Sequence, residues 1–339
     1  MRLVFLLSGE HPYLPRAEVL AAIQAEGGTG KVLEEFDQVL VVETEVNPSL
    51  LASRLGMSHE VWTHLCTSRV EELLEAVGST DVVDLIPHGK TFAVRTVRIK
   101  RYSPEIKREE LSKRIADLIR GEVKFEVDLE KPEVEVCIAL TDGMGIVGMK
   151  VGDTARKGMG SRRPKFRKAF HPSTLFPSLA RCMVNLARAP RGGTILDPFC
   201  GVGGILIEAG LMGMKVWGID LDPKMVERAR INLENYGIEN FRLEVGDACQ
   251  WKGRRVDAIV TDPPYGRQAS TWKRSKEELY RRALPSLVRA LKRGKYMCLT
   301  SPSEVDLGEM AAEVGLEERE RYEQRVHRSL TRRIYVFRG

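Results

Sequence analysis

The chain has 339 residues, of which 43% are hydrophobic, and a formal net charge of +6 at pH 7. This length predicts about two domains with a proper buried core. No apolar run approaches the roughly 18 residues of a membrane span, and the six scattered cysteines include no Cys-x-x-Cys pair. The composition therefore argues against a membrane protein, a disulfide framework and a zinc site, and we expect a cytoplasmic protein without a metal.

The first 68 residues have a pattern typical of a small ferredoxin-like unit of α+β class. The amphipathic run at residues 14–26 ends at Gly27 and Gly28, which predicts a helix. The strands that we expect around this helix are residues 2–7, 38–44 and 58–66.

A second α+β region is predicted over residues 69–151. Its strand at 91–99 alternates arginine with apolar residues, so one face is basic and the other is buried. Pro104 favours the first turn of a helix that begins near Ser103. The other expected elements are a helix at 69–77 and strands at 133–140 and 144–151. The candidate RNA-binding residues are Arg95, Arg98 and Arg101, although neighbouring glutamates leave a mixed-charge surface as the alternative.

A basic linker is predicted at residues 152–169. Seven of the thirteen residues from Arg156 to Lys168 are basic and none is acidic, and Phe166 lies among them. A run of this kind is typical of a segment that follows phosphates and stacks a base, while a solvated linker is the alternative. Its candidate RNA-binding residues are Arg162, Arg163, Lys165, Arg167 and Lys168.

Residues 170–339 alternate strands and helices as a doubly wound, Rossmann-like parallel sheet does. A short strand at 194–197 leads into a loop in which Gly201, Gly203 and Gly204 allow a tight turn and a close approach to a ligand. Asp220 ends the next strand, 23 residues after Asp197. An acid at this separation is typical of the group that binds a ribose diol.

Four successive strands are each followed by an aspartate, at 197, 220, 247 and 262. Ligands of open α/β sheets bind at the carboxyl ends of the strands, so we expect these acids to share one site. The last of them begins the sequence Asp262-Pro263-Pro264-Tyr265, which suits methylation of an amino group conjugated with a ring. The carboxylate and a carbonyl fixed by the prolines can accept the two N–H bonds, and the tyrosine can stack on the ring.

The order of these motifs resembles a class I S-adenosylmethionine-dependent methyltransferase of the amino-methylating kind. The stretches that carry the resemblance are DPFCGVGG (197–204), GIDLD (218–222), GDA (246–248) and DPPYG (262–266). Two more, HPSTLFPSLARCMVNLA (171–187) and HRSLTRRIYVF (327–337), resemble the archaeal tRNA (guanine-10-N2) methyltransferase family. The resemblance is strong over residues 170–337. It implies an RNA-binding THUMP domain ahead of a Rossmann-fold catalytic domain.

The resemblance implies S-adenosylmethionine as cofactor and tRNA as substrate. It assigns catalysis to Asp262, Pro263, Pro264 and Tyr265. It places the cofactor against His171, Ser173, Thr174, Asp197, Phe199, Cys200, Gly201, Gly203, Gly204, Asp220, Leu221, Asp247, Ala248 and Asp262. Cys200 is expected to be a small buried residue rather than a nucleophile. Val202 departs from the threonine usual in the family's loop, so any hydroxyl contact from that position is lost.

Several alternatives stay open at this point. The same motifs occur in DNA adenine-N6 and cytosine-N4 methyltransferases, and a guanine at another position of tRNA, such as 6, is a second possibility. A tRNA-binding protein that has lost catalysis is disfavoured by the four intact acids. The sequence decides neither mono- versus dimethylation nor the oligomeric state. It also leaves open a small zinc-binding activator protein, which some relatives require.

Overall fold

A computed structural model describes residues 1–80, 82, 85–87, 89–122, 126–172, 174–264, 276–327 and 330–339. Contacts divide the chain into two compact units. The first contains Met1–Glu10, Gly28–Ala52 and Ser58–Thr154, and the second contains His11–Gly27, Ser53–Met57 and Ala155–Gly339. This division follows contacts, so the predicted domains 1–68, 69–151, 152–169 and 170–339 stay predictions.

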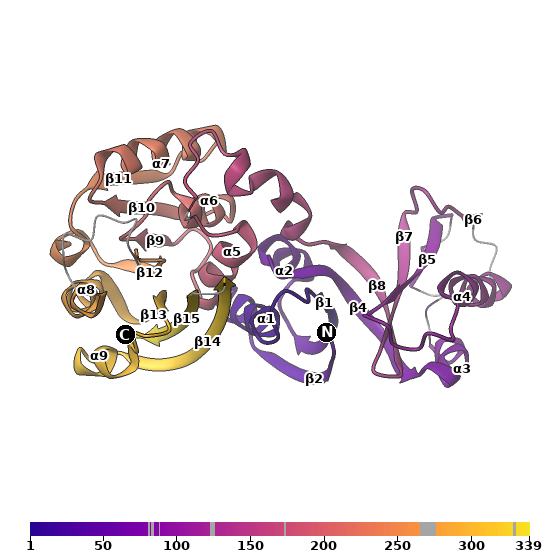
Figure 1. Cartoon of the computed structure of the whole chain (residues 1–339). Helices are drawn as coiled ribbons and strands as arrows, with labels where there is room; N and C mark the ends of the chain where they lie inside the picture. Colours follow the sequence, from indigo (N-terminus) through magenta and orange to yellow (C-terminus); the bar gives the residue numbers. More distant parts are fainter. Residues whose placement is uncertain are drawn as a thin grey trace. The chain divides into compact units, whose positions relative to one another are not determined.

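The first unit is built on an eight-stranded sheet of order β2-β3-β1-β4-β8-β7-β5-β6 (Figure 1). The antiparallel order β2-β3-β1-β4 is that of the expected ferredoxin-like unit. The strands are β1 (Arg2–Leu7), β2 (Gly30–Phe36), β3 (Val39–Thr44), β4 (Ser58–Arg69), β5 (Thr91–Arg98), β6 (Glu126–Val127), β7 (Val134–Thr141) and β8 (Met144–Asp153). Strand β2 was not predicted, because its side chains are mostly half-exposed and show no alternation.

The helices of this region are α2 (Pro48–Arg54), the 3-10 turn η1 (Val70–Glu72), α3 (Leu73–Gly78) and α4 (Arg108–Glu122). The prediction that the last helix begins near Ser103 was wrong. Ser103 has a φ of 47° and its carbonyl accepts the N–H of Ile106 in a turn, so the helix starts at Arg108. Helices α3 and α4 pack on the sheet through buried Leu73 and Ile115.

The second unit contains the predicted doubly wound sheet, with strand order β11-β10-β9-β12-β13-β15-β14. The first five strands pair in parallel, and β15 is antiparallel to both of its neighbours, β13 and β14. The strands are β9 (Thr194–Asp197), β10 (Lys215–Asp220), β11 (Phe241–Val245), β12 (Val256–Thr261), β13 (Leu291–Pro302), β14 (Glu317–His327) and β15 (Leu330–Arg338).

Helices cover both faces of this sheet (Figure 1). Successive strand residues point to opposite faces, so Ile195 joins the core beneath α5 and α6 while Leu196 joins the core beneath α8 and α9. The helices are α1 (Leu14–Ala25), α5 (Pro177–Leu186), α6 (Gly204–Leu211), α7 (Pro223–Asn235), α8 (Lys276–Ala290) and α9 (Gly308–Glu313), with the 3-10 turns η2 (Ala155–Arg162), η3 (Pro164–Phe166) and η4 (Ala248–Gln250). Among the described residues, no helix is long and apolar enough to cross a membrane.

Buried polar groups explain why α1 belongs to the second unit. The Glu18 carboxylate accepts the backbone N–H groups of Gly56 (2.9 Å) and Met57 (2.7 Å) and the side-chain amide of Asn185 on α5 (2.9 Å). Burial raises the pKa of Glu18, an effect that these hydrogen bonds oppose. A buried carboxylate needs such partners, so they fix α1 against α5.

A second buried carboxylate, Glu208 on α6, accepts hydrogen bonds from two guanidinium groups. The Nε atoms of Arg162 and Arg181 each lie 2.9 Å from a Glu208 oxygen, and the Glu208 side chain is fully buried. The ion pair between Arg162 and Glu208 anchors the end of η2, so the predicted linker is held to α6 of the second unit at that point.

Replacing Glu208 with glutamine should therefore lower the free energy of unfolding by about 3 kcal/mol, because two buried guanidinium groups lose their counter-charge. Urea unfolding followed by circular dichroism measures the change. Glu234→Gln, on an exposed position of α7, is the matched control and should change stability by less than about 0.5 kcal/mol. Equal effects of the two substitutions would contradict the role assigned to Glu208.

Candidate cofactor site and RNA-facing segment

The four predicted aspartates stand at neighbouring strand ends of the second unit. Asp197 and Asp220 end β9 and β10, while Asp247 and Asp262 follow β11 and β12 by one or two residues. These strands are adjacent in the order β11-β10-β9-β12 and run parallel, so the acids lie along one edge of the sheet. This edge is where ligands bind in such sheets.

The glycine-rich loop after β9 needs glycine for two reasons. Gly201 and Gly203 have φ values of 50° and 82°, in the left-handed region that side chains disfavour. Gly204 begins α6, and a Cβ atom there would lie 2.6 Å from Cγ2 of Thr174. The loop is therefore a close-packed cradle whose backbone, without side chains, is available to a ligand.

Two residues of this loop point inward. The Val202 side chain is 3% exposed, so the departure from the family's threonine falls on a buried position. Cys200 is buried as expected, and burial raises the pKa of its thiol, which makes it a poor nucleophile. The amide of Cys200 donates to the carbonyl of Ile219, which ties the loop to β10.

Asp197 is the most enclosed of the four acids, at 2% exposure. Its Oδ1 accepts the Thr261 hydroxyl (2.7 Å) and the backbone N–H of Phe199 (3.2 Å). Burial raises the pKa of Asp197 to about 7, and the nearby charges of Asp220 and Asp262 act in the same direction. Asp197 thus shapes the loop and is placed close to two other acids, while Phe199 is half-buried at the turn.

Asp220 keeps an accessible carboxylate. Its Oδ2 accepts the N–H of Gly201 (2.9 Å) and its Oδ1 accepts that of Asp222 (3.0 Å), which leaves a further lone pair on each oxygen. Burial raises the pKa of Asp220. The next residue, Leu221, is 54% exposed and offers an apolar surface beside the carboxylate.

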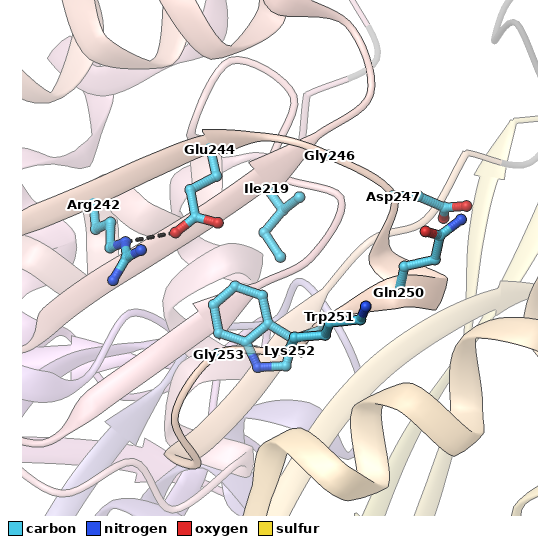
Figure 2. Close-up of a pocket in the computed structure, with 9 residues that line it drawn as sticks. All are labelled: Ile219, Arg242, Glu244, Gly246, Asp247, Gln250, Trp251, Lys252 and Gly253. Carbon is cyan, nitrogen blue, oxygen red and sulfur yellow. Dashed lines mark ion pairs between the residues drawn. The ribbon is translucent and has the colours of Figure 1, made fainter.

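Asp247 lies at the mouth of a cavity of about 440 Å³ at the end of β11 (Figure 2). Its Oδ1 accepts the N–H of Cys249 (2.9 Å) and so caps the turn that contains buried Ala248. In Figure 2 the Trp251 ring and Ile219 face the same space below Glu244. The cavity is lined by Ile219, Arg242, Glu244, Gly246, Asp247, Gln250, Trp251, Lys252 and Gly253. Its lining includes Asp247 but none of the other three acids.

Asp262 is held by two residues that the sequence analysis did not single out. The hydroxyl of Thr300 on β13 donates to Oδ1 (2.5 Å), and Nη1 of Arg332 on β15 lies 3.7 Å from Oδ2. Burial raises the pKa of Asp262, and the Arg332 charge and the Thr300 hydrogen bond oppose this rise. Arg332 falls within the motif at 327–337, which was the one available signal; Thr300 had none.

The remaining predicted site residues are partly placed. Pro263 is buried and Pro264 half-buried after β12. His171 is half-buried and interacts electrostatically with Asp220, and its carbonyl accepts the Thr174 hydroxyl (2.8 Å). Ser173 and Tyr265 lie outside the described residues.

The basic segment at 156–168 divides into exposed and buried side chains. Arg163, Lys165 and Lys168 are exposed, whereas Arg162 pairs with Glu208 and Arg167 is only 5% exposed. Arg162 is half-buried and Arg167 is buried, and their role in RNA binding stays a prediction. Phe166 in the segment is 60% exposed, and sequence reasoning missed two more exposed phenylalanines that follow the segment, Phe170 (50%) and Phe176 (62%).

The three candidate bases of the first unit differ in their surroundings. Arg95 lies 3.4 Å from Glu135 and donates to the carbonyl of Leu129, and Arg98 donates to the carbonyl of Ile106. Arg101 is exposed. Their RNA-binding role stays a prediction.

Comparison with known proteins finds one family model that matches within each of the two compact units. A family model described as an RMKL-like methyltransferase domain matches residues 164–334, and a THUMP domain model matches residues 67–148. The chain is 38% identical to the tRNA (guanine(10)-N2)-dimethyltransferase of Methanothermobacter thermautotrophicus over 99% of both chains. It is also 38% identical to that of Pyrococcus abyssi over 96% of both.

Solved structures share the fold. TrmN from Thermus thermophilus matches with a TM-score of 0.53 and 22% identity, over 100% of this chain and 99% of that one. A putative methyltransferase complexed with SAH matches with a TM-score of 0.56 and 16% identity, over 100% and 98%. At these identities the likeness concerns the fold alone.

Thr300→Val should raise the pKa of Asp262 further, because the hydrogen bond that stabilises the ionised carboxylate is removed while the burial remains. The carboxyl group of Asp262 then ionises at a higher pH than in the wild type. Titration of ¹³C-labelled aspartate carboxyls by NMR, assigned with Asp262→Asn, measures this shift. Thr300→Ser keeps the hydroxyl and should titrate as the wild type does; a valine variant without any shift would remove Thr300 from the site.

Proposed function

The chain belongs to the family of tRNA (guanine(10)-N2)-dimethyltransferases, and we propose that Asp262 is the residue at which it methylates the guanine amino group. The chain is an S-adenosylmethionine-dependent methyltransferase that acts on N2 of guanine 10 in tRNA. The observation that carries the role of Asp262 is its carboxylate at the end of β12, held by Thr300 and Arg332.

The strand ends fit the cofactor. S-adenosylmethionine supplies a methyl group on a positively charged sulfur. The half-exposed Asp220 carboxylate has lone pairs for the ribose hydroxyls, with exposed Leu221 beside it for the adenine ring. Asp247, beside the cavity at the end of β11, would accept the adenine amino group. The glycine cradle at 201–204 would take the methionine part, with His171, Ser173 and Thr174 closing over it.

The chemistry at nitrogen depends on the protonation state of Asp262. The lone pair of the guanine amino group is shared with the ring, so the nitrogen attacks only if its hydrogens are drawn to acceptors. The ionised Asp262 carboxylate and the Pro263 carbonyl would each accept one N–H, and Tyr265 would stack on the ring. When the methyl group passes from sulfur to nitrogen and the sulfur is left as a neutral thioether, Asp262 would stabilise the cationic nitrogen and take its proton. Guanine must leave its stack to reach this site.

Arg332 and Thr300 favour the form of Asp262 that this mechanism needs. Burial raises the pKa of Asp262 and so disfavours the carboxylate, the form that stabilises a cationic nitrogen and takes its proton. The neighbouring guanidinium and hydroxyl oppose this rise and favour the carboxylate. They act on the reaction through Asp262 and are positioning residues.

Two methyl groups are proposed for the product. The relatives from Methanothermobacter, Pyrococcus and Methanocaldococcus jannaschii are each named as dimethyltransferases. A singly methylated N2 still carries one hydrogen, which the Asp262 carboxylate can accept in a second turnover. We also propose a cytoplasmic location, and a small zinc-binding activator protein as a second partner beside tRNA.

The exposed part of the basic segment supports a role in holding tRNA. Arg163, Lys165 and Lys168 are exposed, and Nζ of Lys165 lies 4.8 Å from the centre of the Phe166 ring. Bases interleaved with exposed aromatic rings suit phosphates and unstacked nucleobases together. This segment runs directly into residues 170–174 of the proposed cofactor site, so it could hold the strand that carries the flipped guanine.

Asp262→Asn should reduce turnover at least about 10³-fold, because the neutral amide neither stabilises the cationic nitrogen nor takes its proton. Affinities for S-adenosylmethionine and tRNA should stay within about threefold, as the substitution preserves shape. Tritium transfer from labelled S-adenosylmethionine to a tRNA transcript measures turnover. A transcript with inosine at position 10, which lacks the N2 amino group, is the control and should accept no methyl. Turnover within a few-fold of the wild type would refute the mechanism.

The double substitution of Arg163 and Lys165 by glutamate should weaken tRNA binding about tenfold or more at 0.1 M salt, because phosphate contacts are lost and repulsion is added. It should also flatten the dependence of binding on salt concentration. Fluorescence anisotropy with labelled tRNA measures both. Replacing Lys224 and Arg228, exposed on α7, by glutamate makes the same charge change and serves as the control. Equal weakening by both pairs would mean that the segment affects tRNA binding only through the net charge of the protein.

A further inference from the structure

Arg167 carries a buried guanidinium group with two unused donors. The residue is 5% exposed, and its Nη1 and Nη2 atoms are buried without a hydrogen-bond partner in the described part of the chain. Only Nε is engaged, donating to the carbonyl of Arg162 (3.1 Å). An unpaired buried charge costs several kcal/mol, so a group that accepts from Nη1 and Nη2 is missing.

The described residues around the Arg167 guanidinium do not supply that group. Glu208 is the nearby carboxylate, but its two oxygens already accept from Arg162 and Arg181. Burial lowers the pKa of Arg167; Tyr236 and Glu208 oppose this shift, and the charge of Arg162 adds to it. The segment thus brings more guanidinium groups than carboxylates into one buried region, which favours an anion from outside.

The Arg167 guanidinium lies beside the glycine cradle, and this position favours one anion. A Cβ atom on Gly204 would lie 3.1 Å from Nη1 of Arg167 and 2.6 Å from Thr174 Cγ2, so the guanidinium packs on the first residue of α6. Gly204 ends the glycine cradle against which the methionine part of the cofactor is proposed to lie. The helix N-terminus there also favours negative charge.

We propose that Arg167 binds the carboxylate of the methionine part of S-adenosylmethionine. The inference rests on the proposed site at the glycine cradle and adds the residue that recognises the amino-acid end of the cofactor. A guanidinium fork with two free nitrogens matches a carboxylate in a bidentate pair. A tRNA phosphate is the other anion to consider, but the burial of Arg167 beside the cradle favours the smaller ligand.

The test compares S-adenosylmethionine with its decarboxylated form, which lacks only the carboxylate, by isothermal titration calorimetry on the whole protein without tRNA. The wild type should prefer S-adenosylmethionine at least about tenfold, as expected for a charged hydrogen-bonded pair. Arg167→Met should lose about 10- to 100-fold in affinity for S-adenosylmethionine and less than about threefold for the decarboxylated form. Lys215→Met removes the same charge at an exposed position where β10 begins, and it should leave both affinities unchanged.

The other outcomes are decisive as well. A wild type that binds both compounds equally overturns the carboxylate pair but leaves the proposed function standing, whereas a wild type that binds neither compound refutes the proposed cofactor site itself. Arg167→Met with intact preference but weaker tRNA binding would assign the residue to a phosphate instead. If Arg167→Met does not fold, as judged by circular dichroism, Arg167→Lys keeps the charge and should retain a reduced preference; a lysine variant with the full wild-type preference contradicts the bidentate pair.

Discussion

The site depends on the parallel pairing of one strand, β9, with β10 on one side and β12 on the other. After β9 the chain passes through α6 to β10 on one side, and it later returns as β12 on the other. The carboxyl ends of these strands therefore open a crevice where the winding of the sheet reverses. Asp197, Asp220 and Asp262 meet there because each strand ends in an acid, and no single segment contains the site.

Bringing three carboxylates together at a buried edge sets the electrostatics of the site. Burial raises the pKa of Asp197, Asp220 and Asp262 alike. Such a site favours ligands that bring donors and positive charge, and a sulfonium cofactor with an amino nucleophile brings both. At Asp262, the acid proposed to take the proton, the Arg332 charge and the Thr300 hydroxyl oppose this rise. The strand-end aspartates thus include one residue proposed to act on the amino group, Asp262, and others proposed to bind the cofactor.

The sequence predicts the features of the site whose residues lie close together along the chain. Strand periodicity, the glycine loop and the four strand-end acids each lie within a few residues, and the predicted strands β9 to β12 are confirmed. Thr300 and Arg332 reach Asp262 from β13 and β15, far along the chain. The motif at 327–337 includes Arg332, but no local pattern places either residue beside Asp262. Arg162 and Arg167 look like surface charges in a basic run because Glu208 and Gly204, which explain their burial, lie some forty residues away.

The central claim is where the cofactor lies relative to the strand-end aspartates, so a crystal structure with S-adenosylhomocysteine bound tests it most directly. The ribose should lie on the Asp220 carboxylate, the homocysteine part on the loop at 201–204, and the sulfur should face Asp262 across the space left for guanine. The ligand bound elsewhere, or with its sulfur turned away from Asp262, would contradict the account.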